Sequence, residues 1–98
     1  SIEVFDPRTL FPLDKPMLKK SVEKTGRAII MDDSTRTCSF ASEVAAILSD
    51  ECFSSLKAPI KRITRADVPV PFSLLLEKQV VPDGAPELTQ AIYDMLKK

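Results

Sequence analysis

The sequence predicts an α/β domain of three layers, in which helices cover both faces of a mostly parallel sheet. Short apolar runs suited to strands alternate along the chain with amphipathic stretches suited to helices. The clearest pair is the run at 27–31, which ends at two aspartates, and the stretch 39–56, which repeats an apolar residue at every fourth position. A strand leading into a one-faced helix is half of a parallel crossover unit, so the remaining elements should complete such a sheet.

The N-terminal part of the chain contains an expected strand and an expected helix. Residues 2–5 alternate weakly before an Asp-Pro pair, which favours a strand that ends there. Asp14 fits the N-cap of a helix over 15–25, and Pro16 lies in its first turn, where a missing N–H has no cost. Gly26 is typical of the left-handed residue at which a helix ends.

The rest of the chain supplies a capped helix, a third strand and a last helix. Ser39 can cap the helix that begins after it, and residues 60–64 alternate as a half-exposed or edge strand. The last helix should start at Asp83 or Gly84, with Pro86 in its first turn. Three strands are few for this architecture, so one sheet edge is expected to be open. The apolar stripe expected on the last helix is Leu88, Ala91, Ile92, Met95 and Leu96.

Composition narrows the class of protein. The 98 residues fit one domain, and fourteen basic and fourteen acidic side chains give a net charge of zero. Without a basic cluster, neither nucleic acid nor an anionic membrane is an expected partner. No apolar run approaches the roughly 20 residues that span a bilayer. The chain has no histidine, the commonest general base and metal ligand. Cys38 and Cys52 are typical of reduced thiols in an intracellular protein.

Three polar features around the main helix have both a functional and a structural interpretation. Cys38 near a helix N-terminus could be a reactive thiolate, and the amides of residues 37–40 could bind a small anion. Asp32 and Asp33 could hold a metal ion. The structural interpretation is favoured for each: an ordinary thiol, amides capped by Ser39, and carboxylates that solvate the end of a strand.

Two loops are candidates for contacts outside the domain. Arg8 follows a strand end, where ligands bind in open α/β sheets, but an Asp6–Arg8 pair that braces the turn is favoured. The loop 67–72 contains two prolines, which impose an extended backbone that binds partners at low entropy cost. Its Phe72 is equally well explained as a plug for the chain's own core. Arg8 and Phe72 are therefore the interface candidates.

Four stretches, taken together and in this order, resemble the C-terminal domain of transketolase-type enzymes, which depend on thiamine diphosphate. Residues 6–14 resemble D-x-R-T-L-x-P-L-D, residues 37–43 T-G-G-F-x-x-E, residues 58–64 A-P-[IV]-x-R-[VI]-T, and residues 67–71 D-x-P-x-P. A Cys-Ser pair replaces the paired glycines of the second motif. The closest subgroup is the β subunit of the first component of 2-oxo acid dehydrogenases, acting on pyruvate, branched-chain 2-oxo acids or acetoin. The matching positions are Asp6, Arg8, Thr9, Leu10, Pro12, Leu13, Asp14, Thr37, Phe40, Glu43, Pro59, Asp67, Pro69 and Pro71.

The resemblance implies a transketolase C-terminal-like domain over residues 1–98 that lacks the family's first strand and first helix, and hence a fragment of a larger subunit. In this family thiamine diphosphate and Mg²⁺ lie between the other domains, which supply the catalytic side chains. No catalytic, cofactor-binding or metal-binding residue is therefore assigned to this chain, and the chain alone should be inactive.

The implied role is subunit assembly and partner docking, with the α subunit, a second β subunit and the acyltransferase core as partners. The alternative is a module that binds a small anion at the helix start 37–40. The implied location is the cytoplasm or, in a eukaryote, the mitochondrial matrix. The sequence leaves open whether two copies of the chain pair through the open sheet edge.

Overall fold

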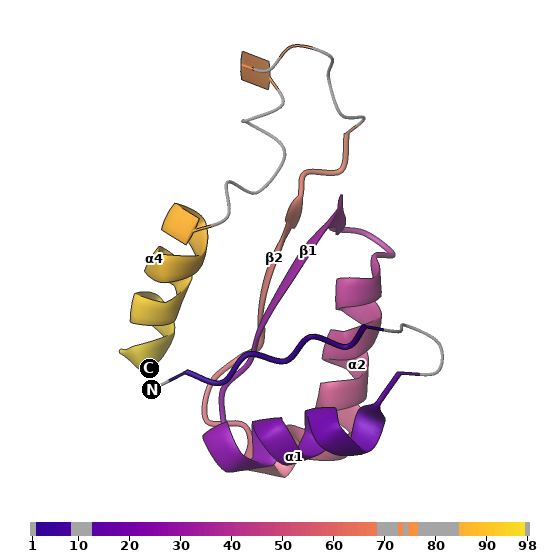
Figure 1. Cartoon of the computed structure of the whole chain (residues 1–98), viewed down its shortest axis with the longest axis vertical. Coiled ribbons are helices and arrows are strands. Elements are labelled where there is room, and N and C mark those ends of the chain that lie inside the picture. The colour runs from indigo at the N-terminus through magenta and orange to yellow at the C-terminus, as the bar shows by residue number, and fades with distance from the viewer. Residues whose placement is uncertain (1, 9–12, 69–72, 74, 77–84, 98) are drawn as a thin grey trace.

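In the part of the chain that the structure describes, the sheet consists of two parallel strands, β1 (Ile29–Thr35) and β2 (Lys61–Arg65). Helix α2 (Phe40–Cys52) packs on one face of this sheet and contacts α1 (Lys15–Thr25), while α4 (Ala85–Leu96) packs against β2 from the other side (Figure 1). The predicted class, a layered α/β domain with parallel strands, is confirmed. The computed structural model describes residues 2–8, 13–68, 73, 75–76 and 85–97.

Helix α1 has the bounds and caps that the sequence predicts. The Asp14 side chain accepts a hydrogen bond from the Met17 amide at 3.2 Å, which satisfies one of the free amides of the first turn. Gly26 ends the helix at φ 76°, and its own amide donates to the Val22 carbonyl at 2.7 Å. Both ends therefore follow from local chemistry.

Helix α2 starts as predicted and ends earlier. The Ser39 hydroxyl accepts from the Ser42 amide at 3.3 Å, as expected of an N-cap. The prediction of a helix reaching residue 56 is wrong, because the chain tightens after Cys52 into a 3₁₀ turn, η1 (Phe53–Ser55). This turn brings Leu56 back against the core, which is why its spacing still matched the helical stripe.

Strand β1 lies further along the chain than the apolar run predicts. The run suggested residues 27–31, ended by Asp32 and Asp33, but both aspartates belong to the strand. Met31 pairs with Ile63, and Thr35 pairs with Arg65. Between these two pairs β1 advances by four residues while β2 advances by two, so the register is irregular there. This irregularity accommodates polar residues that a regular buried strand would exclude. Strand β2 is displaced by one residue from the predicted 60–64.

Residues 2–5 do not form the predicted strand, and within the described residues the sheet has two strands where three were expected. This segment pairs with no strand among the described residues. It is attached by Phe5, which packs against the core, and by Glu3, whose carboxylate accepts from Lys24 Nζ at 3.1 Å. Val4 is 87% exposed, because no neighbouring strand or helix covers that side.

The core lies between α1, α2 and the sheet. Leu18 and Val22 from α1 meet Leu48 and Cys52 from α2. Neither of the two largest fully buried side chains, Leu48 and Cys52, is more than 1% exposed. The partly buried apolar residues around this cluster are Phe5, Leu13, Ala28, Ile30, Val44, Leu56 and Ile60.

Helix α4 covers the opposite face with only part of its predicted stripe. Ala91 and Met95 are buried, as is Ile63 on β2, the strand that α4 contacts. Leu96, expected on the same stripe, is 62% exposed because it lies at the helix end, beyond the covered part of the sheet. The expected start at Asp83 or Gly84 lies outside the described residues. Among the residues described, no helix has the length and apolar character needed to cross a bilayer.

Candidate functional site

The polar residues of the domain gather where β1 and β2 end and α2 begins. Asp32, in the middle of β1, accepts hydrogen bonds from the Ser34 amide at 3.0 Å and from the Ala41 amide, in the first turn of α2, at 3.1 Å. Its carboxylate therefore ties the strand, the loop and the helix start together. The interpretation favoured from the sequence was that this aspartate solvates a strand end.

The pKa of Asp32 is lowered from its ordinary value. Partial burial by itself would raise this pKa, because a charged carboxylate loses hydration. The hydrogen bonds that the carboxylate accepts from the Ser34 and Ala41 amides outweigh that cost, because they favour the ionised form. The carboxylate is thus held charged at the positive end of α2.

Asp67 makes the corresponding link from β2. Its carboxylate accepts from the Thr37 amide at 2.9 Å and from the Thr37 hydroxyl. Both bonds lower the pKa of Asp67, and the bond from the Thr37 hydroxyl has the larger effect. Both residues are family-motif positions, 30 residues apart in sequence, and the structure brings them together. With Thr35, Arg65 and Val68 they line a hollow of about 510 Å³.

Arg62 is the third link in this region. Its Nη1 donates to the Arg36 carbonyl at 3.0 Å and to the Ser42 hydroxyl at 2.6 Å. The Ser42 hydroxyl in turn donates to the same carbonyl at 3.0 Å. The guanidinium is therefore fixed over the first turn of α2, a role that the alternating pattern of β2 could not indicate.

The start of α2 is occupied by the chain's own groups. The Ala41 amide binds Asp32, the Ser42 amide binds Ser39, and Thr37 binds Asp67. An external anion would have to displace these partners and approach two carboxylates whose pKa values are lowered. The geometry therefore supports the capping interpretation of residues 37–40 over the anion-binding one.

The two cysteines have different environments. Cys38 is free and exposed, with a backbone φ of 58°. A left-handed conformation suits the glycine that the family motif has at this place. Cys52 is free and buried in the core, and burial is the main cause that raises the pKa of its thiol. Neither residue forms a disulfide, as predicted. Within the described ranges, no three His, Cys, Asp or Glu side chains are grouped to hold a metal ion.

The N-terminal loop is braced as expected. The Asp6 carboxylate accepts from the Arg8 amide at 3.2 Å and lies 3.9 Å from Arg8 Nε. Both side chains are exposed, so Arg8 remains an interface candidate. Leu13 packs on the core, and Pro59 is exposed. Phe40 and Glu43 lie in the first turn of α2. The predicted positions Thr9, Leu10, Pro12, Pro69, Pro71 and Phe72 lie outside the described residues.

The lowered carboxylate pKa values predict a loss of stability in acid. Asp32 and Asp67 have pKa values below their ordinary 3.8, and Glu3 below 4.5, so ionisation favours the folded state. The free energy of unfolding should be constant above about pH 5 and fall as the pH drops through the ordinary values toward the lowered ones. Urea unfolding from pH 7 to pH 2.5 measures this. Asp32→Asn should cost about 1–2 kcal/mol at pH 7 and flatten the curve. A variant whose curve keeps the shape found for the unchanged chain would contradict this role of Asp32.

Comparison with known proteins identifies a family and several relatives. Residues 1–85 match the family described as transketolase, C-terminal domain. The chain is 51% identical over 80 residues to the acetoin:2,6-dichlorophenolindophenol oxidoreductase subunit beta of Bacillus subtilis, covering 82% of this chain and 23% of the relative. It is 45% identical over 69 residues to the 2-oxoisovalerate dehydrogenase subunit beta of Pseudomonas aeruginosa, covering 70% and 20%.

A eukaryotic relative gives a similar match. The mitochondrial 2-oxoisovalerate dehydrogenase subunit beta of Dictyostelium discoideum is 41% identical over 83 residues, covering 85% of this chain and 22% of the relative. The matched segment is thus under a quarter of each of these three relatives. The relatives named so far include bacterial proteins and one named as mitochondrial. With a family match over residues 1–85, the chain belongs to the transketolase C-terminal domain family.

Proposed function

We propose that this chain is the non-catalytic assembly and docking domain of a 2-oxo acid dehydrogenase β subunit of the pyruvate, branched-chain or acetoin type. The supporting relatives are named as beta subunits of such enzymes, and the matched segment is 23% of the first and 20% of the second. In this proposal the other domains hold thiamine diphosphate and Mg²⁺ and carry the catalytic groups. The partners are the α subunit, a second β subunit and the acyltransferase core.

One observation carries the proposal: large apolar side chains are exposed on several elements of a domain whose polar loop residues bind one another. Exposed apolar side chains can be buried by contact with other proteins or domains, since aromatic residues and methionine are enriched in such interfaces. Asp32, Asp67 and Arg62 meanwhile make hydrogen bonds that shape the loops. The exposed large apolar residues are Ile2, Val4, Met17, Met31, Phe53, Val68, Leu75, Leu76, Tyr93 and Leu96.

Calorimetry tests the absence of cofactor binding. Titration of thiamine diphosphate with Mg²⁺ into the 98-residue chain is expected to give no binding heat, and the chain should not reduce 2,6-dichlorophenolindophenol with acetoin, pyruvate or 2-oxoisovalerate. The full-length Bacillus subtilis beta subunit, assembled with its partner subunit, serves as the positive control. Micromolar binding of the cofactor to the chain alone would end the proposal.

A chimera tests the assembly role directly. In the chimera, residues 1–85 replace the matching segment of the Bacillus subtilis subunit, and a shortened form of that subunit lacks the segment altogether. The chimera should assemble with its partner subunit and reduce the dye, whereas the shortened subunit should not assemble. Normal assembly of the shortened subunit would contradict the proposed role.

A further inference from the structure

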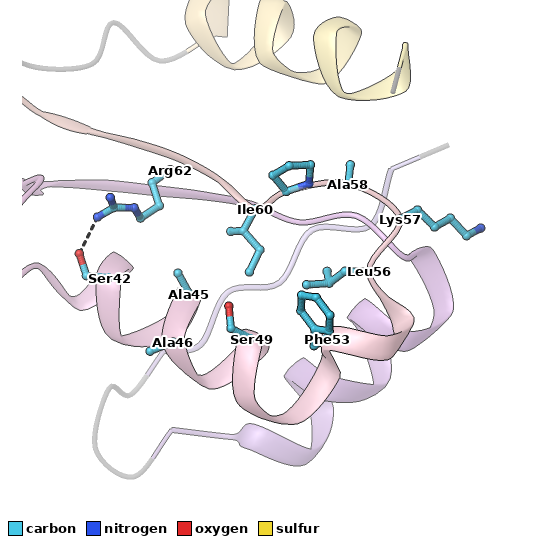
Figure 2. A pocket seen from close by; sticks show the side chains of 11 residues that line it. Ser42, Ala45, Ala46, Ser49, Phe53, Leu56, Lys57, Ala58, Ile60 and Arg62 are labelled. Carbon is cyan, nitrogen blue, oxygen red and sulfur yellow. Dashed lines mark hydrogen bonds between the residues drawn. The ribbon is translucent and has the colours of Figure 1, made fainter.

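A groove runs between α2 and β2 along the outer edge of the sheet. Its volume is about 800 Å³, and its described lining comes from α2, η1, β2 and the segment between η1 and β2, with no residue of β1. Figure 2 shows small side chains of α2, Ala45 and Ser49, below Ile60, with Phe53 and Arg62 toward the two ends. The floor of the groove is therefore formed mostly by small or apolar side chains, and the cationic residues Arg62 and Lys57 lie toward its opposite ends.

The backbone of β2 is unpaired along this groove. The Lys61 amide donates to the Ala28 carbonyl at 3.2 Å, so Lys61 turns its polar backbone groups toward β1. These groups alternate in direction along a strand, so those of Arg62 and Thr64 point to the opposite edge. Among the described residues no strand pairs there, because the sheet order is β1-β2. An extended chain could therefore add to β2 and cover the groove at the same time.

The charges around the groove select an acidic occupant. Lys57 and Arg62 are the charged residues in the described lining. Arg62 Nη1 is held by the Arg36 carbonyl and the Ser42 hydroxyl, which fixes the guanidinium in place and leaves its other nitrogens to bind a carboxylate. Pre-organisation of this kind lowers the entropy cost of binding.

Charged side chains on the other face of β2 disfavour a second copy of this chain at the edge. Two β2 strands paired antiparallel about Ile63 would place Lys61 of one copy opposite Arg65 of the other. Like charges directly opposite each other destabilise a strand pair. The occupant must therefore differ from β2 in charge.

We propose that the open edge of β2 and the adjoining groove bind an extended acidic segment of another subunit, which adds a strand parallel or antiparallel to β2. An apolar side chain of that segment lies over Ala45 and Ala46, and a carboxylate two positions away pairs with Arg62. This inference rests on the proposed assembly function and specifies the partner's chemistry.

The test uses a peptide that reads the same in both directions, acetyl-Thr-Glu-Thr-Val-Thr-Glu-Thr-amide. Alternate side chains of the peptide put one valine between two glutamates on a single face. The peptide therefore presents the same order of side chains to the groove whether it docks parallel or antiparallel to β2. Titration into the ¹⁵N-labelled 98-residue chain should shift the amides of Arg62, Thr64 and the groove side of α2. The same peptide with lysine in place of glutamate is the charge control and should bind about tenfold more weakly or not at all.

Three variants of the chain test whether the peptide binds in the groove beside β2. Arg62→Gln and Ala46→Glu should each raise the dissociation constant about tenfold, the first by removing the cation and the second by adding a negative charge to the groove. Lys61→Gln is the control, because it removes an equal charge one residue away on the other face of β2. This variant should change the dissociation constant of the peptide less than about twofold. Because Arg62 also holds the loop, thermal unfolding checks the fold of that variant. Ala46 is exposed on a helix, so its replacement by glutamate preserves the fold.

Several results would overturn the inference: no binding, equal binding of the lysine peptide, or shifts confined to other surfaces. A dimer of the chain in sedimentation that Ala46→Glu dissociates would assign the groove to a second copy instead. These outcomes are independent of the cofactor titration. Failure of the peptide would leave the assembly proposal standing, whereas micromolar binding of thiamine diphosphate would remove that proposal without altering the peptide shifts.

Discussion

Replacing Leu48 by alanine is expected to lower the free energy of unfolding by about 2–5 kcal/mol. Leu48 is 1% exposed and lies in the cluster that joins α1, α2 and the sheet, so truncation loses buried apolar surface and leaves a cavity. A domain of this size has a total stability of only about 5–15 kcal/mol, so the loss is a large fraction. Urea unfolding followed by circular dichroism measures it.

Leu96→Ala is the matched control for this prediction, because it makes the same chemical change on an exposed helical leucine. Leu96 is 62% exposed, and its truncation should change stability by less than about 0.5 kcal/mol. If the two variants lost equal stability, the core would not lie between α1 and α2 as the structure places it. The unfolding slope should be unchanged in both, which shows that stability changed and not the size of the cooperative unit.

Replacing Gly26 by alanine is expected to cost about 1–2 kcal/mol. The residue has φ 76°, a left-handed conformation that a side chain disfavours. An added Cβ would lie 2.9 Å from Lys57 Cδ, and the Gly26 carbonyl accepts from the Lys57 amide at 2.7 Å, so the backbone has little freedom to move away. Thermal or urea unfolding measures the loss.

Gly26→Asn separates the two causes of that cost. Asparagine brings the same Cβ toward Lys57 but tolerates left-handed backbone better than alanine. We expect the asparagine variant to be the more stable of the two. Equal losses would mean that crowding by Lys57, and not the backbone conformation, determines the requirement for glycine.

The local elements could be predicted from the sequence because their causes lie within a few residues. Asp14, Gly26 and Ser39 end or begin helices by bonds to amides and carbonyls in the same turn. Hydrophobic spacing then placed Leu48 and Cys52 in the core. The family followed from four short stretches because their residue types and order are specific when taken together.

The polar links at the strand ends could not be predicted in the same way. Asp32 looked like a solvated carboxylate, because nothing in its neighbourhood indicates that the Ala41 amide, nine residues on, would meet it. Thr37 and Asp67 matched two separate family motifs, but nothing in the sequence paired them, because their contact depends on the parallel pairing of β1 and β2. The use of Arg62 to fix the start of α2 likewise needs the sheet and helix to be in place.

The amino-acid sequence by itself determined the layered α/β class, the caps of α1 and α2, the buried cluster and the family. Only the tertiary structure decided that residues 2–5 form no strand, that β1 runs on through Asp32 and Asp33, and that the edge of β2 faces an open groove. The physical reason is that caps and apolar periodicity depend on neighbours in sequence. A strand exists only where a second strand accepts its hydrogen bonds, and that partner is determined by packing in space.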